Sequence, residues 1–154
     1  MVTTPGPGRT SVLVDSLVQL SFALQDLLAR AAAEHDLSVT QLRLLGILRD
    51  RTPPMTALAE HLGLDRSSVT GLIDRAQGRG LVTRTASSLD ARVTIVSVTA
   101  KGRRVGGQVA ARVASEIDAL VGHLPKADRD CMVRVAKSVL LGAAAGREPA
   151  FESR

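Results

Sequence analysis

Basic side chains gather in one part of this chain, residues 65–104. This stretch holds eight basic residues and only three acidic ones, an excess equal to the net charge of +5 of the whole protein. The remaining residues therefore carry equal numbers of basic and acidic groups. Positive charge confined to one segment is typical of a surface that binds phosphate groups; a merely solvated surface is the alternative interpretation.

The same region has the residue spacing of a helix-turn-helix motif. Ala59 is a small residue where two helices would cross, and Gly63 is the turn glycine. Val69 and Leu72 are the inward apolar residues of the second helix. Such a helix enters the major groove and presents its outward side chains to bases and phosphates. The outward residues are predicted to be Arg66, Ser67, Ser68, Thr70, Gly71, Asp74 and Arg75.

A hairpin is predicted directly after this helix. Residues 81–84 and 93–98 are rich in β-branched side chains, and the eight residues between them are mostly polar. A basic hairpin in this place is the wing of a winged helix, and Arg92 at its tip is placed to enter the adjacent minor groove. Arg79 and Arg84, near the start of the hairpin, are also predicted to contact DNA.

Helices account for most of the remaining chain, so the predicted fold class is mainly α with one hairpin (α+β). Apolar residues recur every three or four positions over residues 11–34. A capping box formed by Ser38 and Gln41 starts a second helix, and prolines end it after residue 49. Two helices are predicted over residues 57–62 and 66–77, with Asp65 as the N-cap of the latter. Two more follow Thr99, which caps the first, and Pro125.

The apolar surface of the first helix is wider than a single stripe, because Val14, Val18, Phe22 and Leu27 add to the residues that recur every three or four positions. One packing partner cannot bury so wide an apolar surface, and a second subunit could cover the part that remains exposed. Phe22 is interpreted as a core residue rather than as part of a ligand cage.

Composition excludes several other classes of site. With two phenylalanines and no other aromatic residue, the chain lacks a platform for stacking single-stranded bases. One cysteine, Cys131, excludes an internal disulfide, and the three histidines are scattered, so no metal or cofactor is predicted. Cys131 is interpreted as a buried structural thiol rather than a redox sensor. Ser67 could form a hydrolase triad with His61 and Asp65, but no nucleophile elbow or oxyanion loop surrounds it, so no enzyme is predicted.

The start of the chain does not predict a signal peptide. The first residues are rich in proline, glycine and threonine and lack a charged start before an apolar run. No apolar run is expected to reach the length of a membrane span, so a cytoplasmic protein is predicted. Residues 1–10 and 147–154 are expected to form disordered or frayed tails.

Five motifs occur in the order found in the MarR family of bacterial transcriptional regulators, which this chain resembles over about residues 11–145. They are residues 58–63 (LAEHLG), 67–70 (SSVT), 79–84 (RGLVTR), 90–92 (DAR) and 98–103 (VTAKGR). The resemblance implies a homodimer of winged helix-turn-helix lobes that binds pseudo-palindromic double-stranded DNA, by default as a repressor. It also implies that Asp90 and Arg92 pair with each other at the wing tip.

The resemblance divides the chain in the same way. Residues 38–99 are expected to form the DNA-binding domain, and residues 11–37 and 100–146 a helical dimerisation region from both chain ends. In this family a small aromatic or phenolic ligand often weakens DNA binding, and a cleft lined by Phe22, Leu44, Val109 and Val113 is predicted to accept one. The alternative is a protein-binding adaptor with the same winged helix, which would not need the local charge excess.

Overall fold

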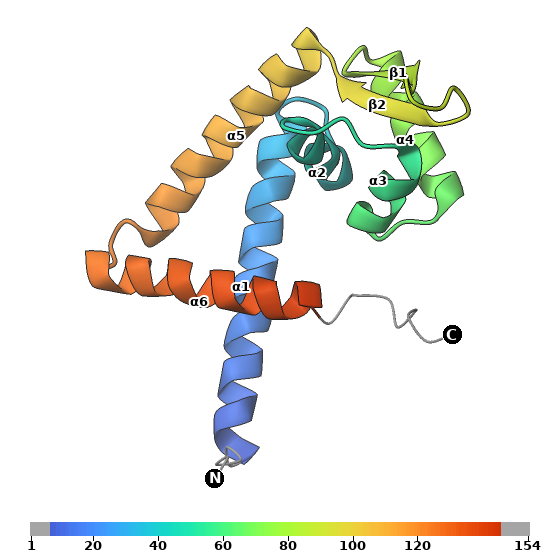
Figure 1. Ribbon diagram of the computed structural model, residues 1–154. Coiled ribbons are helices and arrows are strands. Elements are labelled where there is room, and N and C mark those ends of the chain that lie inside the picture. Colours follow the sequence, from blue (N-terminus) through green and yellow to red (C-terminus); the bar gives the residue numbers. More distant parts are fainter. Residues whose placement is uncertain (1–6, 146–154) are drawn as a thin grey trace, which may run out of the picture. The chain divides into compact units, whose positions relative to one another are not determined.

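The computed structural model describes residues 7–145 (Figure 1). The predicted tails at residues 1–10 and 147–154 lie outside this range, except for residues 7–10. These four residues belong to the first helix, which begins at Pro7 rather than near Ser11. Proline suits a first helical turn, since its fixed φ is helical and its missing N–H would have no partner there.

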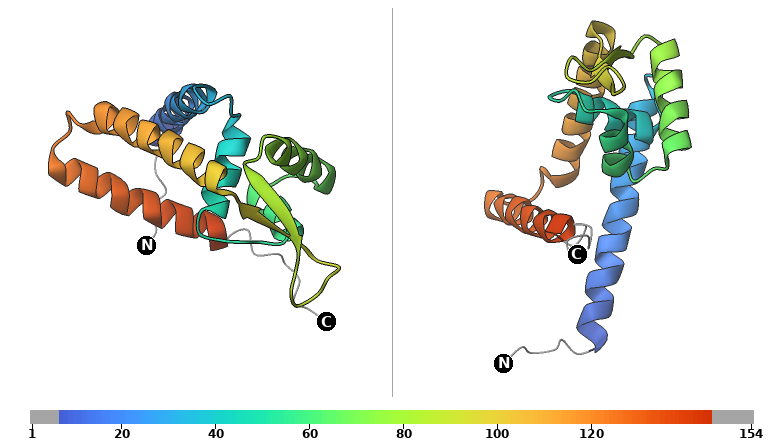
Figure 2. Two further views of the ribbon diagram at one scale, coloured as in Figure 1. Left: turned by 90° about the horizontal axis from the view of Figure 1, so that it is seen from above. Right: turned by 45° about the vertical axis from the view of Figure 1, so that its right-hand side comes forward.

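The described residues form six helices and two strands in the predicted order. They are α1 (Pro7–Ala33), α2 (Val39–Leu48), α3 (Met55–Leu62), α4 (Arg66–Gly78), β1 (Val82–Ala86), β2 (Thr94–Val98), α5 (Ala100–Val121) and α6 (Lys126–Ala145). The strands pair antiparallel, with Val82 opposite Val98 and Ala86 opposite Thr94. The predicted class, mainly helical with a hairpin wing, is confirmed, and the left view of Figure 2 shows the loop of the hairpin projecting from the helices.

The helix caps predicted at the starts of α2 and α5 are present in the structure. The Ser38 hydroxyl accepts a hydrogen bond from the Gln41 amide N–H at 3.1 Å, and the Gln41 side chain accepts one from Ser38 N–H at 3.0 Å. At the start of α5, Thr99 Oγ1 accepts a hydrogen bond from Gly102 N–H at 3.0 Å. These bonds satisfy N–H groups that have no partner within a helix.

Two compact units divide the chain, one ending at Ala114 and one beginning at Ser115. The core of the first unit is aliphatic and joins the end of α1 to α2, α3, α4, the hairpin and the first half of α5. Its fully buried side chains include Leu44, Leu58, Ile73, Val96 and Val109. This core supports the winged helix, because every element of the motif contributes to it.

In the second unit, α6 carries Cys131, which is half-buried rather than buried as predicted. Its sulfur accepts a hydrogen bond of 3.3 Å from the Arg134 guanidinium. Apolar side chains of the same helix are exposed, among them Val139, Leu140 and Leu141. No side chain of α6 that the structure describes is buried, so the packing that the prediction of a buried thiol assumed is not present there.

The first helix is buried only at its C-terminal end. Ala31 and Ala32 belong to the core cluster, whereas every residue of α1 from Ser11 to Leu20 is exposed. Phe22 is 60% exposed, which corrects its assignment to the core. The reason is that the outer face of α1 has no partner within the first unit.

The expectation that no apolar segment reaches the length of a membrane span is wrong for Ser11–Ala33. By length and composition alone this stretch is long and apolar enough to cross a membrane, although Asp15 and Asp26 interrupt it. The burial of Ala31 and Ala32 in the core of the lobe accounts for part of this apolar character.

Candidate nucleic-acid interface

The predicted recognition helix, α4, starts at a cap that gathers three hydrogen bonds. The Asp65 carboxylate accepts one from Ser68 N–H at 2.9 Å and one each from the Ser67 and Ser68 hydroxyls at 2.6 Å. The bond from the Ser67 hydroxyl, followed by those from Ser68, holds the pKa of Asp65 well below its ordinary value. The cap keeps a carboxylate at the helix start, where the helix dipole favours negative charge, and it directs both serine hydroxyls toward Asp65.

The two faces of α4 differ as the sequence predicted. Val69, Leu72, Ile73 and Ala76 are buried against the lobe. The opposite face is exposed over Arg66, Ser67, Ser68, Thr70, Asp74 and Arg75. Gly71 lies between these faces, and a Cβ there would be 3.3 Å from Nη1 of Arg75. The absence of a side chain at position 71 therefore lets the Arg75 guanidinium lie back along the helix.

The wing tip holds an ion pair that the family resemblance implied. Asp90 Oδ1 accepts hydrogen bonds from the main-chain N–H of Arg92 at 3.0 Å and from its Nε at 3.2 Å, while Oδ2 accepts one from Nη2 at 3.3 Å. These bonds, the main-chain one first, lower the pKa of Asp90. The Arg92 side chain is nevertheless 91% exposed, so the pair orients a guanidinium that remains accessible.

Two other predicted contacts turn inward. Arg84 on β1 forms an ion pair of 2.6 Å with Asp74 of α4 and hydrogen bonds with Gln77 and the carbonyl of Thr70. Arg79, after α4, donates hydrogen bonds to the carbonyls of His35 and Asp36. Both arginines add positive charge to the lobe, but their guanidinium groups hold parts of the lobe together.

Two hollows flank the exposed face of α4. One lies between α3, α4 and the hairpin, and its lining includes Thr56, Arg66, Thr70, Arg92 and Thr94. The other lies between α4 and the start of α2, and its lining includes Ser38, Thr40, Ser67, Ser68 and Arg75. Hydroxyl and guanidinium groups are the side chains that contact DNA phosphates most often.

Thr40, Thr56 and Thr94 also line these hollows, although the sequence did not predict them as part of this surface. Thr40 and Thr56 occupy the first turns of α2 and α3, and Thr94 starts β2. Thr40 and Thr56 could have been predicted, because each is a hydroxyl residue at the start of a helix beside the predicted helix-turn-helix.

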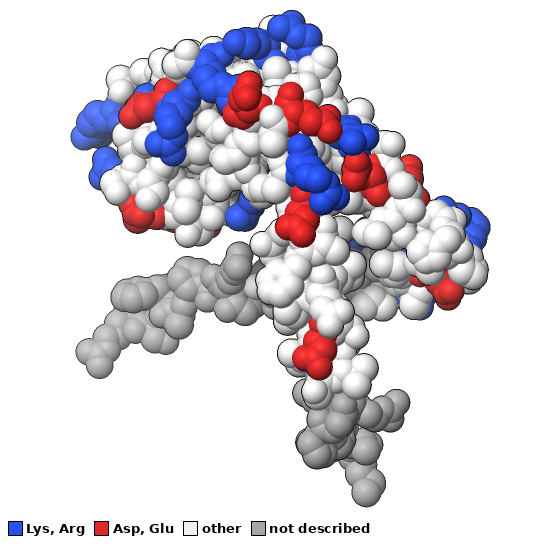
Figure 3. Space-filling model, turned by 180° about the vertical axis from the view of Figure 1, so that it is seen from behind, with Lys and Arg blue, Asp and Glu red and all other residues white. Residues whose placement is uncertain are grey.

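Basic side chains are numerous on the upper part of the molecule when it is seen from behind (Figure 3).

The four residues predicted to line a ligand cleft are not equivalent in the structure. Leu44 and Val109 are fully buried core residues, Val113 is half-buried beside the core, and Phe22 is largely exposed. A side chain closed off by the core offers no surface to a ligand, so the predicted lining is corrected for Leu44 and Val109.

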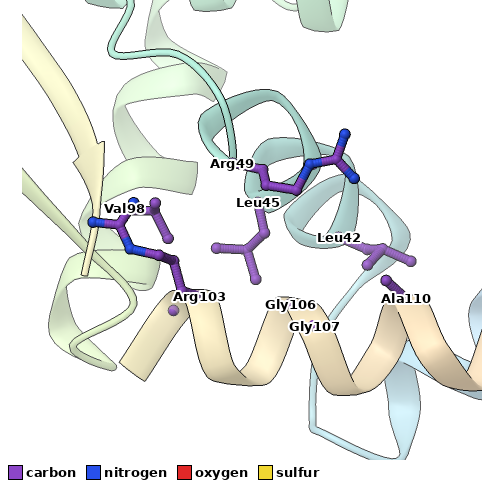
Figure 4. A pocket seen from close by; sticks show the side chains of 10 residues that line it. Leu42, Leu45, Arg49, Val98, Arg103, Gly106, Gly107 and Ala110 are labelled. Atoms are coloured by element: carbon purple, nitrogen blue, oxygen red, sulfur yellow. The ribbon is translucent and has the colours of Figure 1, made fainter. Parts of the chain in front are cut away.

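A different hollow lies between α2 and α5 (Figure 4). Leu42 and Leu45 of α2 face Gly106, Gly107 and Ala110 of α5 across it. Arg49 and Arg103 lie at its edge, with guanidinium groups directed away from the apolar slot. The small residues of α5 leave this slot open, because they project little or nothing toward α2.

The hypothetical hydrolase triad is not assembled. Ser67 Oγ contacts Asp65, but His61 Nδ1 lies 2.8 Å from the carbonyl of Ala57, and its Nε2 lies 3.5 Å from Arg51. Both ring nitrogens of His61 therefore have partners other than Ser67. Within the described residues, no group of three His, Cys, Asp or Glu side chains is placed to hold a metal ion.

Comparisons with known proteins agree with this geometry. The profile of the MarR family matches residues 35–93. The HTH-type transcriptional regulator MhqR of Bacillus subtilis is 25% identical over 122 residues, which cover 79% of this chain and 84% of MhqR. This chain belongs to the MarR family. As a MarR protein it is a DNA-binding transcriptional regulator and not an enzyme.

Solved structures extend the similarity of this MarR regulator to nearly the whole chain. RV1404 from Mycobacterium tuberculosis superposes with a TM-score of 0.76 at 27% identity, covering 97% of this chain and 100% of that one. The transcriptional repressor CouR, bound to a 23-mer DNA duplex, gives 0.75 at 24% identity, covering 90% and 99%. CouR from Rhodococcus jostii RHA1 bound to p-coumaroyl-CoA gives 0.73 at 25% identity, covering 89% and 92%. The winged-helix lobe and the flanking helices thus form one known fold.

Proposed function

We propose that this MarR regulator binds a pseudo-palindromic operator through one continuous surface of each lobe. Arg66, Ser67, Ser68, Thr70, Gly71 and Arg75 of α4 lie in the major groove, and Arg92 enters the adjacent minor groove. The observation that carries the proposal is the exposure of this face of α4 in the same lobe as an exposed, oriented Arg92. Arg79 supports this surface by its hydrogen bonds to the turn beyond α1, Asp74 and Arg84 by the ion pair between α4 and the wing, and Asp90 by its pair with Arg92.

We infer that the binding species is a homodimer. Large apolar side chains of α1 are exposed on the single chain, among them Leu13, Leu17, Val18 and Phe22, and α6 exposes Val139, Leu140 and Leu141. Exposed apolar area of this extent is typical of an interface. A dimer with two-fold symmetry presents two copies of α4, which fits an operator of two inverted half-sites.

The decisive experiment on DNA binding is a footprint and gel shift on the DNA upstream of the protein's own gene. A protected pseudo-palindrome is expected. With about 6–10 phosphate contacts per dimer, affinity should fall by roughly 10³–10⁵ between about 50 and 200 mM salt. Absence of a protected site together with a salt slope shallower than about −3 would favour the adaptor interpretation instead.

The dimer itself is tested by sedimentation of Leu17→Asp. A charge on this exposed apolar position of α1 should give a monomer at micromolar concentration, whereas Gln25→Asp, also exposed on α1, serves as the control for added charge. A wild-type protein that sediments as a stable monomer would contradict the proposal.

We propose further that a small aromatic ligand weakens DNA binding and occupies the slot between α2 and α5. The slot has an apolar lining from Leu42, Leu45 and Ala110, and the binding of p-coumaroyl-CoA by CouR supports an aromatic group. A ligand changes DNA affinity only if it binds the two states of the protein differently. Screening aromatic acids and their CoA conjugates by thermal shift, then by DNA release, tests this.

A matched pair of variants locates the ligand. Gly106→Leu should fill the slot and abolish binding, whereas Ala111→Leu on the exposed side of α5 should leave it intact. A ligand that still binds Gly106→Leu occupies another site. We also propose that the protein acts in the cytoplasm and represses transcription, so deletion of its gene should raise expression from the footprinted promoter.

A further inference from the structure

Arg79 connects the end of the recognition helix to the end of α1. Its main-chain N–H closes α4 with a hydrogen bond of 3.2 Å to the Arg75 carbonyl. Its side chain spans 43 residues of sequence and donates from Nη1 to the carbonyl of Asp36 and from Nη2 to that of His35, the latter at 2.9 Å. One planar guanidinium thus holds two successive main-chain carbonyls, a geometry that fixes both distance and orientation.

The carbonyls that Arg79 holds belong to a tight turn just beyond α1. Asp36 has a φ of +55°, in the left-handed region that non-glycine residues seldom adopt. The turn is closed by Leu37 N–H, which donates to the Ala32 carbonyl at 3.0 Å. Arg79 therefore stabilises one defined conformation of the connection between α1 and α2.

The start of α5 contacts the segment that follows α4, at Arg79 and the two residues after it. Lys101 Nζ donates to the Arg79 carbonyl at 2.7 Å, and Thr99 Oγ1 donates to the Gly80 carbonyl at 2.7 Å. Gly102 approaches so closely that a Cβ would be 2.0 Å from the Leu81 carbonyl oxygen. The segment following α4 is thus a junction to which both α1 and α5 are tied by polar contacts.

The ends of α1 have different surroundings. Its C-terminal end is held by the core and by Arg79, and its N-terminal half is the exposed apolar surface that we assign to the dimer contact. We infer that Arg79 is a positioning residue that transmits the placement of α1 to the recognition helix. It thereby sets the separation of the two α4 helices in the dimer, and with it the half-site spacing that the protein accepts. This inference rests on the proposed homodimer.

Core packing alone leaves this placement less defined. Ala31 and Ala32 of α1 and Ala76 of α4 are small, buried and apolar, and apolar burial is not directional. The paired hydrogen bonds of Arg79 are directional. A lysine at position 79 keeps the charge but offers a compact ammonium in place of the planar fork.

The experiment uses the full-length protein and an operator selected by wild-type protein from random duplex DNA. The half-sites are then moved apart by one or two base pairs, which rotates one half-site relative to the other by about 35° or about 70°. Wild-type protein should lose affinity by about tenfold or more for the altered spacings. Arg79→Lys should accept them with a loss below about threefold, while binding unrelated DNA as wild type does because its charge is retained.

Two controls separate positioning from stability. Arg104→Lys makes the same change at an exposed residue of α5 and should keep the wild-type spacing preference. Asp36→Gly removes the steric cost of the left-handed backbone conformation at position 36. Adding it to Arg79→Lys should therefore restore thermal stability but not the preference for one half-site spacing. If it restores both, Arg79 acts only on the stability of the turn and the inference is overturned.

The remaining outcomes are also distinct. A wild-type protein that prefers one spacing and an Arg79→Lys variant with the same preference overturn the role of Arg79 and leave the proposed function standing. A wild-type protein indifferent to spacing overturns both, because a rigid two-fold dimer on paired half-sites cannot ignore a rotation of this size.

Discussion

Arg84 Nη1 lies 2.6 Å from Oδ1 of Asp74, so the first strand of the wing is ion-paired to the outer face of the recognition helix. The same guanidinium donates to Gln77 Oε1 at 3.2 Å and to the Thr70 carbonyl at 3.3 Å. The Arg84 side chain is only 25% exposed. The wing and α4, which in the proposed complex reach two neighbouring grooves of the same DNA, are therefore held in one relative orientation.

The first prediction concerns this link. Arg84→Ala should lower the free energy of unfolding by about 1–2 kcal/mol, because three hydrogen bonds to a partly buried cation are lost, whereas the exposure of Asp74 limits the effect of the ion pair. Urea denaturation measures it, with the exposed neighbour Thr85→Ala as control. An Arg84→Ala protein as stable as wild type but weaker on all DNA would show that Arg84 serves phosphate contact instead.

The second prediction divides the work of DNA recognition. Arg92→Ala should weaken binding to specific and unrelated DNA together, since an arginine in the minor groove responds to groove width and potential more than to base identity. Asp90→Ala should do the same more weakly, because it frees the guanidinium without removing it. Arg75→Ala should weaken specific binding by about 1–3 kcal/mol per half-site and relax preference at one base position.

Binding-site selection on these three variants is the measurement. Selected sequences for Arg92→Ala should keep the wild-type major-groove bases. If Arg92→Ala changes those bases and Arg75→Ala does not, the assignments of wing and recognition helix are reversed.

The third prediction compares two glycines of α5. Gly102→Ala should lower the free energy of unfolding by about 1–3 kcal/mol, because its Cβ would overlap the Leu81 carbonyl oxygen at 2.0 Å and force α5 to shift. Gly107→Ala meets nothing within 4 Å and should instead raise it by about 0.5–1 kcal/mol through helix propensity. Equal effects of the two substitutions in thermal or urea unfolding would contradict the close packing of α5 on the segment after α4.

The fourth prediction concerns pH. Hydrogen bonds from Ser67 and Ser68 place the pKa of Asp65 in the folded protein below its ordinary value of 3.8. A depressed pKa means that the carboxylate stabilises the folded state above pH 3.8, and that this contribution is lost as the pH falls through the folded value.

Asp65→Asn keeps a cap but removes the charge. Wild-type protein should therefore be more stable than this variant near neutral pH, and the difference should shrink as the pH falls from about 5 to about 2. Urea denaturation across this range measures it, with Asp50→Asn, which caps no helix, as the control at neutral pH. A difference that stays constant down to the lowest pH would show that the charge of Asp65 contributes nothing.

The sequence alone determined the features that depend on neighbours a few residues apart. Ser38 and Gln41 form their capping box within one turn, Asp65 caps α4 through Ser68, and Asp90 reaches Arg92 across two residues. The inward and outward faces of α4 follow from the helical period in the same way. Such contacts need only local backbone geometry, so residue types and spacing suffice to predict them.

Only the tertiary structure decided the features that depend on distant neighbours. Arg79 and Arg84 were predicted to contact DNA, but the groups that their side chains bind lie 43 and 10 residues away and become available only when the end of α1 and the wing pack beside α4. Leu44 and Val109 are buried because α2 and α5 both contribute to the core of the first unit. Phe22 lies on a side of α1 that no element of the first unit covers. Burial and long-range hydrogen bonds are set by how the elements come together, and the spacing of residues along the chain does not contain that information.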